Sequence, residues 1–207
     1  MPVFFYRTIE ASAEGLYKEK GSKFLAFAYP VGSEEDIRQK LAALKKQHYD
    51  ARHHCYAWVL GPEKKRYRAF DDGEPNHSAG DPILGQIRSR DLTDVLVVVV
   101  RYFGGTKLGV GGLITAYKTA TEDALERTVV IEKEVREAFT LRYAYSSTPE
   151  VMRAVKEFEV SILQQDFSEM CVLQGEVPLR LQEKFVEKIV LMKALGATVA
   201  LVTFPKV

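Results

Sequence analysis

Glycines gather in one segment of this chain, where they follow a β-branched run and precede a helical pattern. Five of the 14 glycines lie between residues 104 and 112. Glycine accepts positive φ and admits another molecule close to the backbone, and a helix start offers free N–H groups. The glycines can also serve only close packing of strand against helix, although packing needs no flanking lysine and arginine. We predict a phosphate-binding turn made by Arg101, Gly104, Gly105, Thr106, Lys107, Gly109, Gly111 and Gly112.

A second polar cluster precedes this turn, in a stretch rich in glycine and proline. Its members are Asp71, Asp72, Glu74, His77, Ser78 and Asp81. Carboxylates this close together can hold Mg²⁺ or act as a general base. Residues of these types also cap helices and close turns. A triad of Ser78, His77 and Asp72 is conceivable, but the Gly-x-Ser-x-Gly motif of a nucleophile elbow is missing. We expect this cluster and the glycine turn to share one cleft.

The spacing of these residues excludes the standard nucleotide and metal motifs. In a P-loop the lysine follows the last glycine, whereas Lys107 precedes Gly109. No acidic residue ends a following strand about 20 residues on, where dinucleotide-binding folds place one. On a strand, His53 and Cys55 would share one face and His54 the other, without the second ligand pair of a zinc site. We therefore predict no metal and no cofactor.

The charge of the chain is balanced in both halves. Residues 1–134 hold 20 Lys and Arg against 19 Asp and Glu, and residues 135–207 hold 9 against 9. Because nonspecific nucleic-acid binding depends on neutralising phosphates, a polyanion must be met at a local site. The one dense basic run, at 64–68, contains Tyr67. That pattern suits RNA stacking, and it equally suits a solvated edge strand that resists pairing.

Hydrophobic periodicity predicts the elements that position these residues. In the first half, strands are expected at 3–9, 15–20, 22–30, 53–60, 64–70 and 94–102, and helices at 34–48, near 83–87 and at 113–128. Ser33 is the expected cap of the first helix. The β-branched run of 94–102 predicts a strand buried on both faces.

The second half has its own pattern. Strands are expected at 137–145, 160–167, 170–177 and 198–204, and helices at 148–158, capped by Thr148, and at 178–195. This β-α-β-β-α-β order is that of a ferredoxin-like domain. We therefore predict an α+β chain of two closely joined domains, 1–134 and 135–207.

Composition points to a cytoplasmic protein. Cys55 and Cys171 are too few for a disulfide framework and are expected to be buried, reduced thiols. The N-terminus lacks the pattern of a signal peptide. No apolar run approaches the ~20 residues that cross a bilayer, so no membrane association is expected.

Two long segments carry a resemblance to a known family. Residues 70–82 (FDDGEPNHSAGDP) and 98–117 (VVVRYFGGTKLGVGGLITAY), preceded by 50–57 (DARHHCYA), closely resemble the signature of the YigZ/IMPACT family. The resemblance covers the whole chain, and the second half looks like the bacterial members. It implies an N-terminal domain similar to the second domain of a small-subunit ribosomal protein. It also implies a ferredoxin-like C-terminal domain similar to one in elongation factor G.

The resemblance also implies a role in translation. Eukaryotic relatives act in translational control by binding a ribosome-associated activator of a stress kinase, but they lack this C-terminal domain. We expect a non-catalytic regulatory protein that binds RNA phosphate or a ribosome-associated protein through the glycine turn. The alternative is an enzyme that acts on a phosphorylated small molecule with Mg²⁺. The sequence gives no prediction of oligomeric state.

Overall fold

A five-stranded antiparallel sheet organises the larger part of the chain in the computed structural model, which describes residues 2–203. Its order is β2-β3-β6-β4-β5. The strands are β2 (Ala13–Glu19), β3 (Ser22–Pro30), β4 (His53–Leu60), β5 (Arg66–Phe70) and β6 (Val95–Tyr102). The predicted β-branched strand is β6, and it lies at the centre with Val95–Val100 fully buried. The chain thus combines sheets and helices, as the α+β prediction requires.

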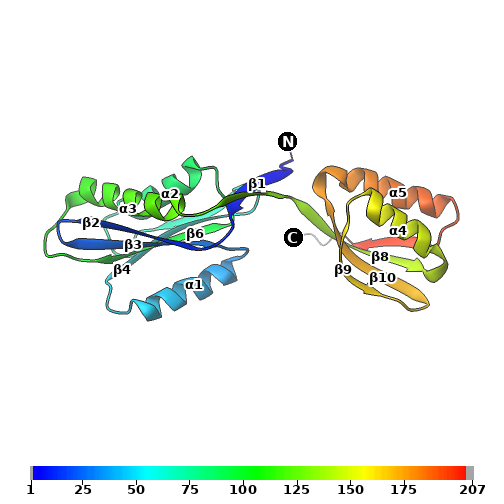
Figure 1. The fold of residues 1–207 in the computed structure, drawn as a ribbon, viewed down its shortest axis with the longest axis horizontal. Helices are drawn as coiled ribbons and strands as arrows, with labels where there is room; N and C mark the ends of the chain where they lie inside the picture. Colours follow the sequence, from blue (N-terminus) through cyan, green and yellow to red (C-terminus); the bar gives the residue numbers. More distant parts are fainter. Residues whose placement is uncertain (1, 204–207) are drawn as a thin grey trace. The chain divides into compact units, whose positions relative to one another are not determined.

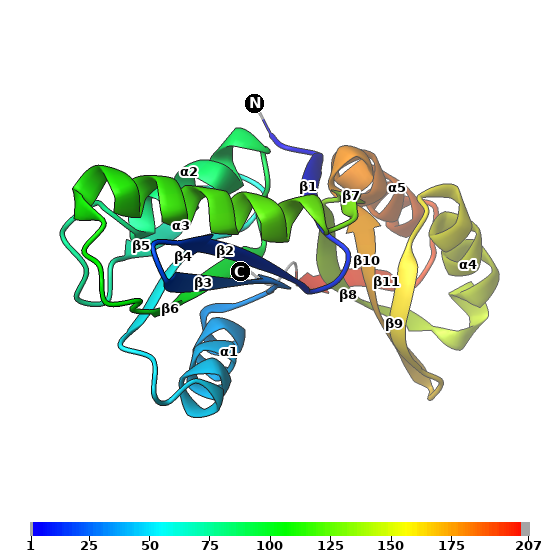
Figure 2. The same ribbon diagram turned by 60° about the vertical axis from the view of Figure 1, so that its left-hand side comes forward.

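Helices cover both faces of this sheet (Figures 1 and 2). α2 (Gly80–Ser89) and α3 (Gly109–Glu126) lie on one face, and α1 (Glu34–Gln47) lies on the other. Successive side chains of β6 alternate between the two cores. Val97 and Val99 pack in the core with α2 and α3, whereas Val98 and Val100 pack in the core with α1.

Two helix starts in this part differ in how well the sequence predicted them. Ser33 caps α1 as predicted, because its Oγ accepts a hydrogen bond of 3.1 Å from the N–H of Asp36. The predicted start of α3 at residue 113 was wrong, since the helix begins at Gly109. The four residues that the prediction left out include Gly109, Gly111 and Gly112, and glycine disfavours helix.

One strand was not predicted: β7 (Val130–Glu134) pairs with β1 (Phe5–Ile9) in a separate two-stranded sheet. Three of the five residues of β7 are charged and most are exposed, so its hydrophobic pattern is weak. Its pairing with β1 depends on residues more than 120 positions away in the sequence.

A second sheet follows, with the order β11-β8-β10-β9. The elements are β8 (Arg136–Ala144), α4 (Thr148–Glu157), β9 (Ser161–Asp166), β10 (Met170–Pro178), α5 (Gln182–Ala194) and β11 (Val199–Thr203), with short 3₁₀ helices at Tyr145–Ser147 and Leu179–Leu181. This is the predicted β-α-β-β-α-β order. Leu141, Tyr143 and Phe185 lie in its core. Thr148 does not cap α4; its hydroxyl instead donates to the carbonyl of Tyr145 at 2.6 Å. Residue 204 of the predicted last strand lies outside the described residues.

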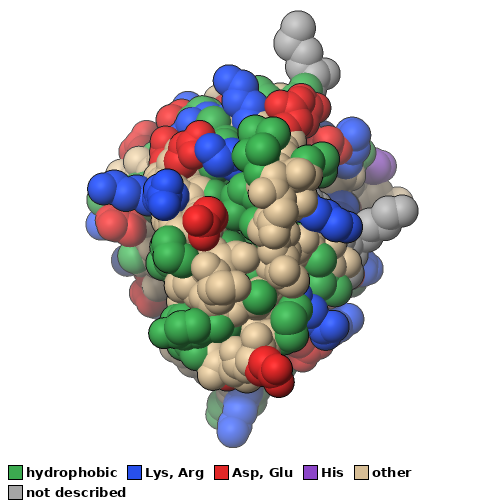
Figure 3. Space-filling model, turned by 90° about the vertical axis from the view of Figure 1, so that its right-hand side faces the viewer, with side chains coloured by type: hydrophobic (Ala, Val, Ile, Leu, Met, Phe, Trp, Pro, Cys, Tyr) green, Lys and Arg blue, Asp and Glu red, His purple; other side chains and the backbone are tan. Residues whose placement is uncertain are grey.

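The chain divides into two compact units, Phe5–Lys133 and a smaller one that joins Met1–Phe4 to Glu134–Val207. That the chain consists of folding domains 1–134 and 135–207 stays a prediction. Charged side chains of both signs are interspersed with hydrophobic ones on the face of the smaller unit in Figure 3. Within residues 2–203, no helix is long and apolar enough to cross a membrane.

Candidate functional site

Strand pairing brings the site residues together at the end of β6. Arg101 lies opposite Phe24 of β3 on one side and opposite His53 of β4 on the other. Residues directly opposite each other in antiparallel strands point to the same face of the sheet. Phe24 packs in the core with α2 and α3, so Arg101 and His53 also face those helices.

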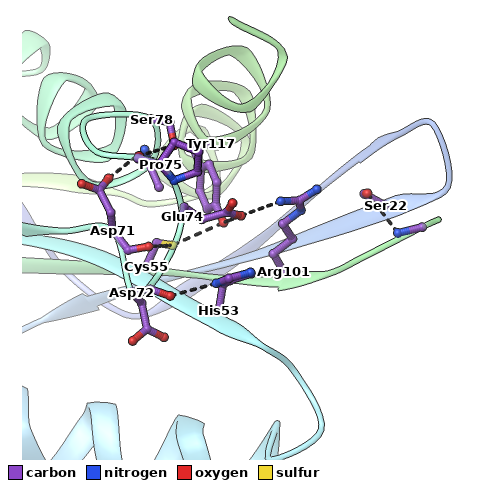
Figure 4. Close-up of polar contacts among 12 residues, drawn as sticks. Ser22, His53, Cys55, Asp71, Asp72, Glu74, Pro75, Ser78, Arg101 and Tyr117 are labelled. Carbon is purple, nitrogen blue, oxygen red and sulfur yellow. Dashed lines mark hydrogen bonds and ion pairs between the residues drawn. The ribbon is translucent and has the colours of Figure 1, made fainter. Parts of the chain in front are cut away.

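Arg101 forms a buried ion pair with Glu74, one residue from each predicted cluster (Figure 4). Arg101 Nη1 lies 2.6 Å from Glu74 Oε1, and the two side chains are only 7% and 4% exposed. The hydroxyl of Tyr117, on α3, donates to the same Glu74 oxygen at 2.7 Å. Arg101 Nε is buried and has no hydrogen-bond partner among the described residues. Glu74 therefore neutralises the charge of Arg101, while the N–H group at Arg101 Nε remains without an acceptor among the described residues.

Cys55 completes this buried network. Its Sγ lies 2.9 Å from the carbonyl oxygen of Asp71 and 3.3 Å from the hydroxyl of Tyr117. Burial raises the pKa of the Cys55 thiol and that of the Tyr117 hydroxyl, so both stay protonated at neutral pH. A protonated, buried thiol is a poor nucleophile. Cys55 therefore serves packing and hydrogen bonding here.

Two carboxylates of the second cluster, those of Asp71 and Asp72, accept hydrogen bonds from the backbone. Asp71 Oδ1 accepts hydrogen bonds from the N–H groups of Ala79 and Gly80, at 3.0 and 2.8 Å. Asp71 Oδ2 accepts from the N–H of His77 at 2.9 Å. Asp72 Oδ2 accepts from the N–H of His54 at 2.7 Å. Asp71, Asp72 and Glu74 thus have separate partners and do not converge on a common point, which a shared Mg²⁺ would require.

The conceivable Ser78–His77–Asp72 triad is not assembled. The Ser78 hydroxyl donates to the carbonyl of Pro75 at 2.6 Å and is fully buried. His77 is exposed, and its Nδ1 lies 2.6 Å from Asp81 Oδ2. Ser78, His77 and Asp72 therefore each have a different partner.

The glycines of the turn have different roles. A Cβ on Gly104 would lie 1.9 Å from the carbonyl carbon of Gly21, so this glycine is required by packing against the β2–β3 turn. Gly105 and Gly109 have φ of +87° and +72°, which other residues adopt only with strain. A Cβ on Gly111 would meet nothing within 4 Å, and its φ is not positive. Contacts within the described chain therefore do not explain Gly111.

The start of α3 is arranged to receive an anion. Its N-cap residue, Leu108, makes no capping hydrogen bond through its side chain. Leu108 is in the right-handed helical region, and Gly109 follows with φ of +72°. Right-handed and left-handed residues in succession form a concave nest of N–H groups that binds anions. The positive end of the helix dipole adds to this preference.

A pocket of 490 Å³ opens beside this helix start. Its lining includes the basic residues Arg52, His53, Arg101 and Lys107, and the acidic residue Glu74. His53 Nδ1 lies 2.8 Å from the carbonyl oxygen of Asp72; since a carbonyl only accepts, Nδ1 carries a proton. With Glu74 paired to Arg101, the excess positive charge of the pocket comes from Arg52 and Lys107.

Both predicted clusters contribute to this pocket, but unequally. Glu74 comes from the second cluster, and Arg101, Lys107 and Gly109 come from the glycine turn. Thr106, His77 and Asp81 are exposed, and none is among the lining residues. Arg52 and His53 line the pocket but were not among the predicted site residues. His53 lies there because β4 pairs with β6 in a register that sets His53 opposite Arg101, and no motif in the sequence specifies that register.

Comparison with known proteins identifies related chains. The Impact N-terminal domain matches residues 20–125. The IMPACT family member YvyE of Bacillus subtilis is 32% identical over 79% of this chain and 76% of its own length. The IMPACT family member YigZ of Escherichia coli is 31% identical over 82% of this chain and 84% of its own. A crystal structure of a hypothetical protein, 26% identical, covers 98% of this chain and 99% of that chain with a TM-score of 0.75.

Proposed function

Because the chain belongs to the IMPACT family, we propose that it is a cytoplasmic, translation-associated regulatory protein that binds an RNA phosphate at the start of α3. The family resemblance supports the link to translation, since eukaryotic relatives act in translational control. The proposal includes the two domain likenesses that the sequence suggested. Residues 1–134 would resemble a domain of a small-subunit ribosomal protein, and 135–207 a ferredoxin-like domain of elongation factor G.

One observation carries the phosphate assignment. The uncapped start of α3 faces a pocket with Arg52, His53, Arg101 and Lys107 in its lining. Helix-start N–H groups and a nest each favour an anion, and arginine and lysine are common phosphate ligands. Arg101 Nε is a buried donor that lacks a partner among the described residues. A small displacement of the Arg101 side chain toward the pocket would let a phosphate oxygen satisfy this donor.

The balanced charge of the chain agrees with a local site of this kind. Residues 1–134 carry one excess positive charge, 20 against 19, so the surface as a whole attracts polyanions weakly. The pocket concentrates positive charge because Asp71 and Asp72 are turned to backbone N–H groups. RNA would then be held through few phosphates rather than along a basic face.

The enzymatic alternative has one supporting feature. A volume of 490 Å³ falls in the range of small-molecule sites, about 300–1,000 Å³. The separate partners of Asp71, Asp72 and Glu74 argue against a shared Mg²⁺ or a free general base. We therefore favour binding over catalysis.

The test compares two exposed lysines of the same region. Lys107 lines the pocket, whereas Lys118 is an exposed residue of α3 outside it. Binding of labelled RNA is measured by fluorescence anisotropy at several salt concentrations. We expect Lys107→Ala to weaken binding about 3- to 10-fold and to reduce the salt slope by about 1. Equal effects of Lys107→Ala and Lys118→Ala would refute the site. Ribosome association without RNA binding would instead favour a ribosomal protein as the partner.

A further inference from the structure

Phe103 stands out as a large aromatic residue left exposed beside the pocket. It follows β6 directly, is 53% exposed, and belongs to none of the apolar cores formed by the described residues. The guanidinium carbon of Arg101 lies 5.6 Å from the centre of the Phe103 ring and 5.4 Å from that of Phe24. Arg101 therefore supports the Phe103 ring from within the protein, while about half of Phe103 remains open to solvent.

Phe103 also lines a second pocket, of 590 Å³. Lys18, Lys23 and Tyr102 are among its other lining residues. Lys23 lies opposite Tyr102 in the β3–β6 pairing, and Tyr102 packs in the core with α1. This second pocket is therefore on the α1 face of the sheet, whereas the phosphate pocket is on the face of α2 and α3. Phe103 lies at the strand end where the two pockets meet.

The backbone around Phe103 is held in place. Gly104 packs directly on Gly21, and its N–H donates to Ser22 Oγ at 3.1 Å (Figure 4). The end of β6 is thereby fixed to the β2–β3 turn. An exposed ring on a fixed backbone can stack on a ligand at little entropic cost.

An exposed aromatic ring with cations on both sides is the arrangement that single-stranded nucleic acids require. Bases stack on aromatic rings, and lysines or arginines neutralise the adjacent phosphates. Here Lys107 and Arg52 lie in one pocket and Lys18 and Lys23 in the other. Asp50, the acidic residue of the second pocket, accepts a hydrogen bond from the Tyr102 hydroxyl at 3.0 Å.

We infer that the ligand is single-stranded RNA and that Phe103 stacks on one of its bases. This inference rests on the phosphate site proposed above. The strand passes around the end of β6, with one phosphate at α3 and the next nucleotides toward Lys18 and Lys23. A double helix is disfavoured on this path, because a duplex is stiff (DNA has a persistence length of about 150 bp) and its paired bases are not free to stack on Phe103.

The experiment measures binding of three labelled probes to the full chain: a single-stranded RNA, its duplex, and an abasic oligonucleotide of equal length. Phe103→Ala is expected to weaken single-strand binding about 5- to 100-fold and to leave abasic binding unchanged. Phe103→Trp should restore the affinity, and its fluorescence should be quenched on binding. Trp58 is only 8% exposed and provides a constant background. Thermal unfolding of each variant checks the fold.

The results of this experiment can contradict the stacking at Phe103 and the phosphate site at α3 independently of each other. Equal loss of single-strand and abasic binding in Phe103→Ala, or no loss at all, overturns the stacking inference. Duplex binding as tight as single-strand binding overturns it as well. If Lys107→Ala still weakens the abasic probe in those cases, the phosphate site stands. If Phe103→Ala weakens RNA binding while Lys107→Ala changes nothing, the phosphate site fails and the stacking surface remains. Saturable binding of a ribosomal protein at Phe103, with no RNA binding, would overturn both.

Discussion

The starts of α2 and α3 differ in whether a carboxylate of the chain itself accepts hydrogen bonds from the N–H groups at the helix start. Both follow a polar turn in the same unit, and neither has an N-cap side chain of its own. At α2, the Asp71 carboxylate accepts from the N–H groups of Ala79 and Gly80. At α3, a nest and a basic pocket take the place of such a carboxylate. The chain thus supplies the anion of α2 itself, and we propose that α3 receives its anion from a ligand.

The Glu74–Arg101 pair links these two regions. Glu74 belongs to the turn before α2, and Arg101 belongs to the strand before α3. The pair fixes the distance between the two turns and so shapes the pocket between them. Tyr117 of α3 bonds to the same carboxylate oxygen and adds the helix to this arrangement.

Removing the Glu74–Arg101 ion pair should cause the largest loss of stability among these predictions. Glu74→Ala leaves the buried Arg101 charge without its partner, which typically costs about 3–5 kcal/mol in the free energy of unfolding. Urea unfolding followed by circular dichroism measures this loss. The double variant Glu74→Gln with Arg101→Met, which has no unpaired charge, should lose less than Glu74→Ala. A double variant that is less stable than Glu74→Ala would contradict this role of the pair.

Removing the Asp71 carboxylate at the start of α2 should cause the second largest loss of stability. Asp71→Ala removes the acceptor of three backbone N–H groups, and we expect a loss of about 2–3 kcal/mol in the free energy of unfolding. Asp71→Asn keeps one carbonyl oxygen and should lose less. Equal stability of Asp71→Ala and the unchanged protein would mean that water caps α2 as well as the carboxylate does.

Local patterns predicted much of the fold and less of the site. The β-branched run of residues 94–102 predicted β6, and Ser33 predicted the start of α1. Helix propensity misplaced the start of α3, because the first turn of this helix holds Gly109, Gly111 and Gly112, and glycine disfavours helix. The Glu74–Arg101 pair joins residues 27 positions apart, and His53 meets Arg101 only through strand pairing. Such contacts require the order and register of the strands, which the sequence analysis did not assign.

A substitution at Gly111 can test ligand binding at α3 separately from the stability of the fold. Gly111→Ala adds a methyl group where the described chain leaves space, and it should raise the free energy of unfolding by up to about 1 kcal/mol. Under the proposed assignment it should nevertheless weaken RNA binding, because the methyl group would stand on the exposed first turn of α3, beside the lining residues Gly109 and Val110. Gly109→Ala, at a φ of +72°, should instead be destabilising by about 1–2 kcal/mol. Unchanged RNA affinity in Gly111→Ala would place the ligand away from this turn.

The smallest effect on stability is expected for Lys107. Lys107 is exposed and forms no ion pair with the residues that the structure describes, so Lys107→Ala should change the free energy of unfolding by less than about 0.5 kcal/mol. Phosphate that binds the folded state should nevertheless raise the melting temperature of the unchanged protein, relative to chloride at equal ionic strength. Lys107→Ala should reduce that rise. Asp71→Asn, which alters only the start of α2, should keep it. If Lys107→Ala keeps the full rise and Asp71→Asn loses it, α2 rather than α3 is the helix start that an external anion reaches.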